Sequence, residues 1–222
     1  MKPIAHIETD FPTKFGIPRQ SGLIDELVGR IVFEKDYRDP QALRGLDDFS
    51  HLWLLWEFSE NKREDWSPTV RPPRLGGNKR VGVFATRSPF RPNPIGLSCV
   101  KLIAIKAEEE GTVLYVSGAD LMNGTPIYDI KPYIPLTDCK PEATEGYTKE
   151  TKQYALTVDF PADLLTLVPE EKQPALIQVL EQDPRPSYID DPQREYGVYF
   201  GKQNIRFTVN DHILTVIKVE AI

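Results

Sequence analysis

Residues 98–118 read SCVKLIAIKAEEEGTVLYVSG, and this stretch decides the fold. Two runs rich in aliphatic and β-branched residues, Ser98–Ala107 and Thr112–Gly118, flank the polar residues Glu108, Glu109, Glu110 and Gly111. Runs of this composition are typical of strands, and the polar residues between them are typical of a tight connection. The stretch therefore predicts a β-hairpin.

Three further segments extend the predicted sheet. Gly29–Phe33 and Arg80–Thr86 alternate apolar and other residues with the period of two that half-buried strands show. His51–Phe58 (HLWLLWEF) is apolar on both faces, which predicts a central strand or a barrel wall. No unit of strand, glycine loop and helix repeats along the chain, which disfavours a doubly wound nucleotide-binding fold. We predict a mainly β fold built on a closed or nearly closed antiparallel β-barrel, because closure removes exposed edges.

The composition changes after about residue 150, where the helical pattern appears. Phe160–Asp183 is the best helical stretch, and its main helix either begins near Gln173 or consists of two short helices meeting at Pro174. The chain ends on three predicted strands: Tyr196–Phe200, Ile205–Val209 and Ile213–Val219. We expect the barrel to occupy residues 1–150 and a small α+β domain to occupy residues 151–222.

Overall composition excludes several classes of protein. Of the 222 residues, 40% are hydrophobic and 27% are charged, as in soluble globular proteins. No apolar run approaches the roughly 20 residues of a membrane span, and the first residues lack the apolar region of a signal peptide. The two cysteines and three histidines are scattered, so no metal site is expected. We predict a cytoplasmic protein with reduced thiols, no membrane association and no metal.

The charge distribution is uneven. The net charge is −6, yet the segment from Trp66 to Lys101 contains seven basic residues and no acidic one. A basic block inside an acidic chain concentrates positive potential where an anion could dock. The alternative is that these side chains pair with the acidic residues of the rest of the chain.

The basic block overlaps a stretch that is dense in proline, glycine and arginine. Val70–Ser98 reads VRPPRLGGNKRVGVFATRSPFRPNPIGLS. Prolines restrict the backbone, so donors on such a loop lose little entropy on binding, and planar guanidinium groups suit carboxylates, phosphates and stacked bases. We interpret the stretch as a binding loop; a purely structural proline-rich loop is the alternative.

Two more stretches combine turn residues with polar side chains. In Gly118–Tyr133 (GADLMNGTPIYDIKPY), Asp120 and Asn123 can present oxygens to a ribose or an ammonium group. Asp129 and Lys131 are two apart on a predicted strand and should share a face. The alternative is an ordinary hairpin with a salt-bridged exit strand. The segment 16–22 again combines proline, arginine and glycine in one turn.

The patterns RPPRLGGNKRxGVFATR, RxPFRPNPIGLS and DLxNGTPIxDIKPY closely resemble the TsaA-like family. The tail QDPRPSY…YGVYFGKQNIRFTV resembles the small C-terminal domain of its bacterial members. The resemblance implies an S-adenosylmethionine-dependent tRNA methyltransferase built on a β-barrel. It implies methylation of N6 of threonylcarbamoyladenosine at position 37, in the anticodon loop of threonine tRNA. It also implies a homodimer with the cofactor site near the subunit contact.

Carried onto this chain, the resemblance predicts a set of cofactor contacts. They are Pro18, Arg19, Gln20, Ser59, Glu60, Arg87, Leu97, Asp120, Leu121, Met122 and Asn123. Arg19 or Arg87 would hold the cofactor carboxylate, Asp120 the ribose hydroxyls, and Leu97 the adenine. Many members carry a histidine where this chain has Ser59, so we expect a backbone contact at that position.

Five basic residues are predicted to serve RNA rather than the cofactor: Arg71, Arg74, Lys79, Arg80 and Arg91. Asp129 and Tyr133 are the candidates for accepting the proton that leaves N6, and the residues alone do not decide between them. A non-catalytic module that binds S-adenosylmethionine or an RNA loop is the alternative function. A phosphoester hydrolase using the arginine-rich loop is disfavoured by the lack of metal ligands.

Overall fold

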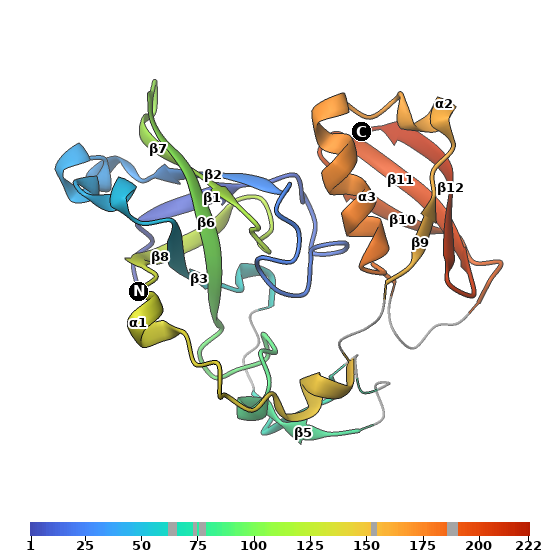
Figure 1. Ribbon diagram of the computed structural model, residues 1–222, viewed down its shortest axis with the longest axis horizontal. Helices are drawn as coiled ribbons and strands as arrows, with labels where there is room; N and C mark the ends of the chain where they lie inside the picture. Colours follow the sequence, from blue (N-terminus) through green and yellow to red (C-terminus); the bar gives the residue numbers. More distant parts are fainter. Residues whose placement is uncertain (62–65, 73–74, 76–78, 152–154, 186–190) are drawn as a thin grey trace.

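Six antiparallel strands form a closed ring in the computed structural model (Figure 1). The structure describes the chain apart from residues 62–65, 73–74, 76–78, 152–154 and 186–190. The ring follows the order β1, β2, β7, β6, β3, β8, and β8 pairs back onto β1. Its strands are β1 (Ala5–Glu8), β2 (Val28–Phe33), β3 (His51–Glu57), β6 (Ile95–Glu108), β7 (Gly111–Ser117) and β8 (Thr125–Pro132). The prediction of a mainly β fold with antiparallel pairing is confirmed.

Strand β3 lies between β6 and β8 in the ring wall, in the central position that its sequence predicts. The side chains of Leu52, Leu54 and Trp56 are buried, whereas those between them are only partly covered. The buried side chains join a core with Ile31, Ile127 and other apolar residues inside the ring. The inward side chains thus stabilise the ring by removing apolar surface from water.

The predicted hairpin of β6 and β7 is confirmed. The strands pair from Lys101–Ser117 to Glu108–Gly111, so two residues make the turn. Only the later part of β6 pairs with β7; along the earlier part, Cys99 N donates to Ser21 Oγ at 3.0 Å. The loop between β1 and β2 therefore lies against the free edge of β6.

The prediction of a strand over Arg80–Thr86 is wrong. Only β5 (Val81–Gly82) is extended and paired, with β4 (Thr69–Val70), and the 3-10 helix η6 (Val83–Ala85) follows directly. Val83 is buried but Ala85, two residues further on, is exposed, so the apolar residues of the predicted inner face are not covered together. With only a two-residue partner, the segment has no sheet to extend.

Short helices connect the remaining parts of the first 151 residues. They are η1 (Lys35–Tyr37), η2 (Pro40–Leu43), η3 (Leu46–Asp48), η4 (Ser59–Asn61), α1 (Pro135–Asp138) and η7 (Gly146–Thr151). No helix in the described part of the chain is long and apolar enough to cross a membrane.

The C-terminal part forms a four-stranded mixed sheet in the order β10, β11, β12, β9. Its strands are β9 (Thr157–Asp159), β10 (Tyr196–Phe200), β11 (Gln203–Asn210) and β12 (Ile213–Ala221), and the helical segments are α2 (Ala162–Leu165), η8 (Glu170–Lys172) and α3 (Gln173–Glu181). The main helix begins at Gln173, the first of the two predicted arrangements, and Pro174 occupies its first turn, where no N–H donor is required. Leu176, Val179 and Leu180 are buried, as the helical spacing predicts.

The segment between β1 and β2 packs against the C-terminal sheet and lies between the two parts in Figure 1. Phe11, Ile24 and Leu27 are buried in the same core as the residues of α3 and β11. The ring of Phe11 meets that of Phe200 edge-on, with centroids 5.6 Å apart. The C-terminal core is therefore completed by residues from the beginning of the chain.

Candidate functional site

The loops with the predicted cofactor residues gather at one end of the ring. Strand register defines this end, because Glu57 lies opposite Ile95, Ile7 opposite Thr125, and Val28 opposite Ser117. Four connections meet there: β1 to β2, the segment after β3, the segment before β6, and β7 to β8. The sequence-predicted residues thus come from separate loops at a common end.

Asp120 is the most constrained polar group of this end. Ser98 Oγ donates to Asp120 Oδ1 at 2.5 Å, and Trp56 Nε1 donates to Ser98 Oγ at 2.9 Å. Burial raises the pKa of Asp120 above its ordinary value, although the Ser98 hydrogen bond and the charge of Arg87 act in the opposite direction. Asp120 is therefore a largely buried carboxylate whose position is set by a chain of hydrogen bonds.

Gly96 makes room for the first member of that chain. A Cβ at Gly96 would lie 2.2 Å from Cε2 of Trp56, closer than real side chains approach one another. The Trp56 ring also packs on Phe58, with centroids 4.3 Å apart. The Trp56 indole therefore packs between the backbone of Gly96 and the ring of Phe58. This packing orients the indole N–H toward Ser98.

Arg87 and Gln20 come together from two loops. Arg87 Nη1 donates to Gln20 Oε1, and Gln20 Nε2 donates to the carbonyl of Arg19 at 2.5 Å. Gly22 N donates to Gly118 O at 2.9 Å, which ties the Gln20 loop to the end of β7. Arg87 is exposed and acts on Asp120 through its charge. The site therefore carries a guanidinium group at its surface and a carboxylate beneath.

The other predicted cofactor residues differ in what they present. Leu97 is 52% exposed on the wall of the ring, whereas the side chain of Leu121 is buried in the ring core. Asn123 Oδ1 accepts from Thr9 N at 3.0 Å, and Met122 O accepts from Thr125 Oγ1 at 2.7 Å. Leu97 thus offers an apolar surface to a ligand, while the residues after Asp120 mainly shape their loop.

Three further predicted cofactor residues lie in the same loops. Pro18 is buried, whereas Glu60 is exposed in η4 next to the partly covered Ser59. Phe58 N donates to Pro94 O at 2.9 Å, which holds the start of η4 against the segment before β6. The described contacts do not join Ser59 or Glu60 to Asp120.

The two candidates for proton acceptor are not brought into contact with Asp120. Tyr133 lies beyond the far end of β8, where its N donates to His51 O at 2.9 Å. Its ring packs beside Trp53, and burial raises its pKa above the ordinary value. Asp129 pairs with Lys131 at 2.7 Å, so the predicted shared face is confirmed. A proton-accepting role for either residue stays a prediction.

The basic residues predicted for RNA lie around β4 and β5. Arg71, Lys79 and Arg80 are exposed, and Arg74 lies outside the described residues. Arg80 Nη1 donates to Thr69 Oγ1 at 3.0 Å, and Arg91 Nη1 donates to the carbonyls of Val83 and Thr86. None of the described ion pairs includes a basic residue of this block. The charge of Arg87, which belongs to this block, does act on the carboxylate of Asp120.

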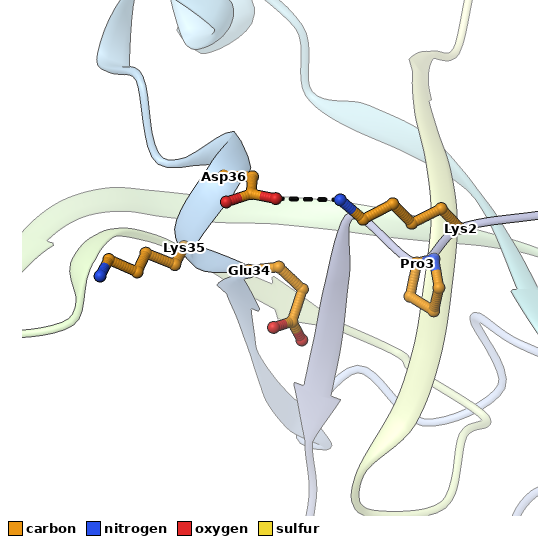
Figure 2. Close-up of a pocket in the computed structure, with 5 residues that line it drawn as sticks. All are labelled: Lys2, Pro3, Glu34, Lys35 and Asp36. Atoms are coloured by element: carbon orange, nitrogen blue, oxygen red, sulfur yellow. Dashed lines mark hydrogen bonds and ion pairs between the residues drawn. The ribbon is translucent and has the colours of Figure 1, made fainter.

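The described residues add neither a metal site nor a neighbouring pocket to this end of the ring. The described residues include no group of three histidine, cysteine or carboxylate side chains that could hold a metal ion. A surface pocket of about 310 Å³ is lined by Lys2, Pro3, Glu34, Lys35 and Asp36 (Figure 2). Lys2 and Asp36 pair across it at 2.9 Å, and both are exposed. It lies where β1 begins and β2 ends, at the opposite end of the ring from Asp120.

Sequence reasoning missed Trp56, Ser98, Ser21 and Gly96. Ser98 belongs to the motif RxPFRPNPIGLS, and the sequence could have indicated its role. It is a polar residue on the same strand face as Gly96 and Val100, and all three are buried. A buried polar side chain requires a partner, so such a position indicates a nearby polar group. Trp56 carried no comparable signal, because an indole in an apolar run is typical of a core.

The fold and site define a mainly β protein with a ligand site built from loops at one end of a strand ring. The tRNA-methyltransferase O N-terminal domain family matches residues 6–139, and the TrmO C-terminal domain family matches residues 153–222. The chain belongs to the tRNA-methyltransferase O family.

Two relatives and one solved structure are similar to this chain over most of its length. The tRNA (adenine(37)-N6)-methyltransferase of Escherichia coli is 41% identical, covering 98% of this chain and 96% of the relative. A Pseudomonas aeruginosa relative described as an S-adenosylmethionine-dependent methyltransferase is 39% identical, covering 89% and 87%. The crystal structure of TrmO from P. aeruginosa has a TM-score of 0.79 at 32% identity, covering 99% of this chain and 95% of that chain.

Proposed function

We propose that the protein is an S-adenosylmethionine-dependent tRNA methyltransferase that methylates N6 of adenosine 37. The observation that carries the proposal is the partly buried carboxylate of Asp120, which accepts a hydrogen bond from Ser98 and feels the charge of Arg87. Membership of the tRNA-methyltransferase O family over both parts of the chain supports it. The E. coli relative, a tRNA (adenine(37)-N6)-methyltransferase, supports it as well.

The residues at this end of the ring fit the cofactor by their chemistry. The cofactor supplies an electrophilic methyl group on a positively charged sulfur. Arg87 and Arg19 offer guanidinium groups to its carboxylate, Asp120 offers acceptor oxygens to ribose hydroxyls, and the exposed Leu97 offers an apolar face to adenine. Pro18, Gln20, Ser59, Glu60 and the residues from Leu121 to Asn123 complete the proposed contacts through side chains or backbone.

The chain contributes mainly orientation and exclusion of water. Exocyclic N6 of adenosine is a poor nucleophile, so its alignment with the methyl group and removal from water should supply much of the rate. Ser98 and Trp56 fix Asp120, and Gly118 fixes the Gln20 loop through Gly22 N. These contacts hold the binding groups in place before the substrate arrives.

The proposal includes finer statements that the family resemblance supports. The substrate is threonylcarbamoyladenosine in the anticodon loop of threonine tRNA, the enzyme works as a homodimer, and it is cytoplasmic. Catalysis and cofactor binding belong to residues 1–150, and residues 151–222 form the small α+β domain. Arg71, Arg74, Lys79, Arg80 and Arg91 contact the tRNA backbone.

Methyl transfer to threonine tRNA tests the function directly. Purified protein with labelled cofactor should methylate tRNA that carries threonylcarbamoyladenosine and release S-adenosylhomocysteine. Arg87→Ala or Asp120→Ala should weaken cofactor binding about 10- to 150-fold, because each removes a charge-assisted contact of roughly 1.5–3 kcal/mol. Asp36→Asn, at the opposite end of the ring, is the control and should bind normally. Cofactor binding without any turnover would favour the non-catalytic module instead.

A further inference from the structure

Two aromatic rings are stacked on the surface near β4 and β5. Trp66 is 51% exposed and Phe84 is 71% exposed, yet their ring centroids lie 6.1 Å apart with planes inclined by 30°. Neither residue belongs to the core of the ring or to that of the C-terminal sheet. The pair thus presents a broad apolar surface outside both cores.

Ordered backbone contacts bring the two rings together. Thr69 pairs with Gly82 and Val70 with Val81, and one step further Val83 N donates to Pro68 O at 2.9 Å. This short ladder places Trp66, just before β4, beside Phe84, just after β5. The segment of β5 projects from the strand ring at the bottom of Figure 1. The stacked pair is therefore built by local pairing and stands on a projecting part of the protein.

One arginine side chain lies against the pair, and two more lie next to the same short sheet. The Arg91 guanidinium carbon lies 5.6 Å from the centroid of Phe84, and Arg91 Nη1 donates to Thr86 O at 2.7 Å, which fixes it there. Arg71 and Arg80 are exposed at the other end of the β4–β5 ladder, where Arg71 follows β4 and Arg80 precedes β5. The chain from Trp66 to Lys101 contains no acidic residue. An anionic partner therefore meets basic side chains and no acidic one along this segment, although Glu64 and Asp65 directly precede Trp66 in the sequence.

We propose that Trp66 and Phe84 form a stacking platform for an unpaired base of the anticodon loop. Exposed aromatic rings on a basic segment, with an arginine against one of them, are a combination by which proteins hold single-stranded nucleic acid, since rings stack on bases and guanidinium groups contact phosphates. The inference rests on the proposed tRNA substrate and adds the residues that would seat its loop.

A second copy of the chain is the other occupant for such a surface. A symmetric dimer contact through this face would place two copies of the same basic segment against each other. Like charges brought together in this way oppose association. The local charge thus favours RNA over self-association.

Substitution of the two rings tests the platform. Trp66→Ala and Phe84→Ala should each weaken tRNA binding and raise KM for tRNA about 5- to 150-fold, the range found for loss of one base–aromatic stack. Cofactor affinity and melting temperature should stay unchanged, because both side chains lie outside the cores. Phe84→Tyr keeps a stacking face and should bind close to normally. Phe49→Ala, an exposed aromatic position outside the basic segment, is the matched control.

Salt dependence separates stacking from charge. Trp66→Ala should leave the slope of binding against salt concentration unchanged, whereas Arg80→Gln should flatten it, since only a phosphate contact releases counterions. Unchanged tRNA binding in both ring variants would overturn the proposal. A shift of either variant from dimer to monomer by light scattering would overturn it in favour of a self-association surface. Absence of tRNA methylation by the unsubstituted protein would instead refute the proposed function.

Discussion

Gly96 offers the sharpest test of the hydrogen-bond chain that positions Asp120. In Gly96→Ala the new Cβ would lie 2.2, 2.4 and 2.5 Å from three atoms of the Trp56 ring, whereas packed carbon atoms sit about 3.5–4.0 Å apart. Such overpacking costs about 1–3 kcal/mol when side chains or backbone must shift. The Trp56 ring must therefore move, and its N–H leaves Ser98.

Gly82→Ala is the matched control. Gly82 also has an extended backbone, with φ −60°, but nothing lies within 4 Å of the position its Cβ would take. Both alanines reduce the freedom of the unfolded chain by a similar amount, about 0.4–1 kcal/mol. The difference between the two variants in free energy of unfolding therefore isolates the overlap with Trp56, which we expect to be about 1–3 kcal/mol.

Urea unfolding of the two variants, followed by circular dichroism, measures this difference. Titration with S-adenosylmethionine on the folded proteins should show weaker binding for Gly96→Ala and normal binding for Gly82→Ala, because only the first displaces the donor to Ser98. Equal free energies of unfolding would refute the packing argument. A lower free energy of unfolding for Gly96→Ala with unchanged cofactor affinity would refute the link from Trp56 through Ser98 to Asp120.

Three further outcomes follow from the site and its supports. Burial raises the pKa of Asp120, so the folded protein loses stability as pH rises through the folded-state pKa and the carboxyl ionises. Asp120→Asn should therefore increase the free energy of unfolding near pH 7. Urea unfolding across pH should show this gain disappear below the unfolded-state pKa of about 3.9. Gly16→Ala should destabilise more than Gly22→Ala in thermal unfolding, since both have positive φ but only Gly16 would meet Val198, at 2.1 Å. Calorimetric titration of S-adenosylmethionine should give the same affinity with and without a chelator, because the described residues include no group of three histidine, cysteine or carboxylate side chains that could hold a metal ion.

The strands could be predicted from the sequence because burial on one face produces a period of two. The strand at His51–Phe58 was an exception, because its sequence is apolar on both faces; in the structure β3 nevertheless buries Leu52, Leu54 and Trp56 and leaves the residues between them half-covered. The period of two failed at Arg80–Thr86, where Val83 is buried but Ala85, two residues further on, is exposed. Alternation predicts a strand only where a partner strand exists, and the partner here is two residues long.

The sequence predicted which loops carry the candidate site residues, but not the contacts that hold those residues in place. The motif residues Arg87 and Asp120 were identified by resemblance, and the structure brings their loops to one end of the ring. Their support comes from Trp56 and Ser98, which lie 42 residues apart in the chain. Local pattern carries no information on such a pairing, because it depends on the register between β3 and β6.

The loop that contains Gln20 depends on both parts of the protein. On one side, Gly22 N donates to Gly118 O, at the ring end that carries Asp120. On the other side, Phe11 and Ile24 flank the loop and are buried in the C-terminal core, and Gly201 N donates to Asp10 O at 2.7 Å. A loop with both flanks packed on the C-terminal sheet cannot keep its shape independently of that sheet. If the proposed cofactor site is correct, the C-terminal part supports one of its walls without supplying any of the predicted contacts.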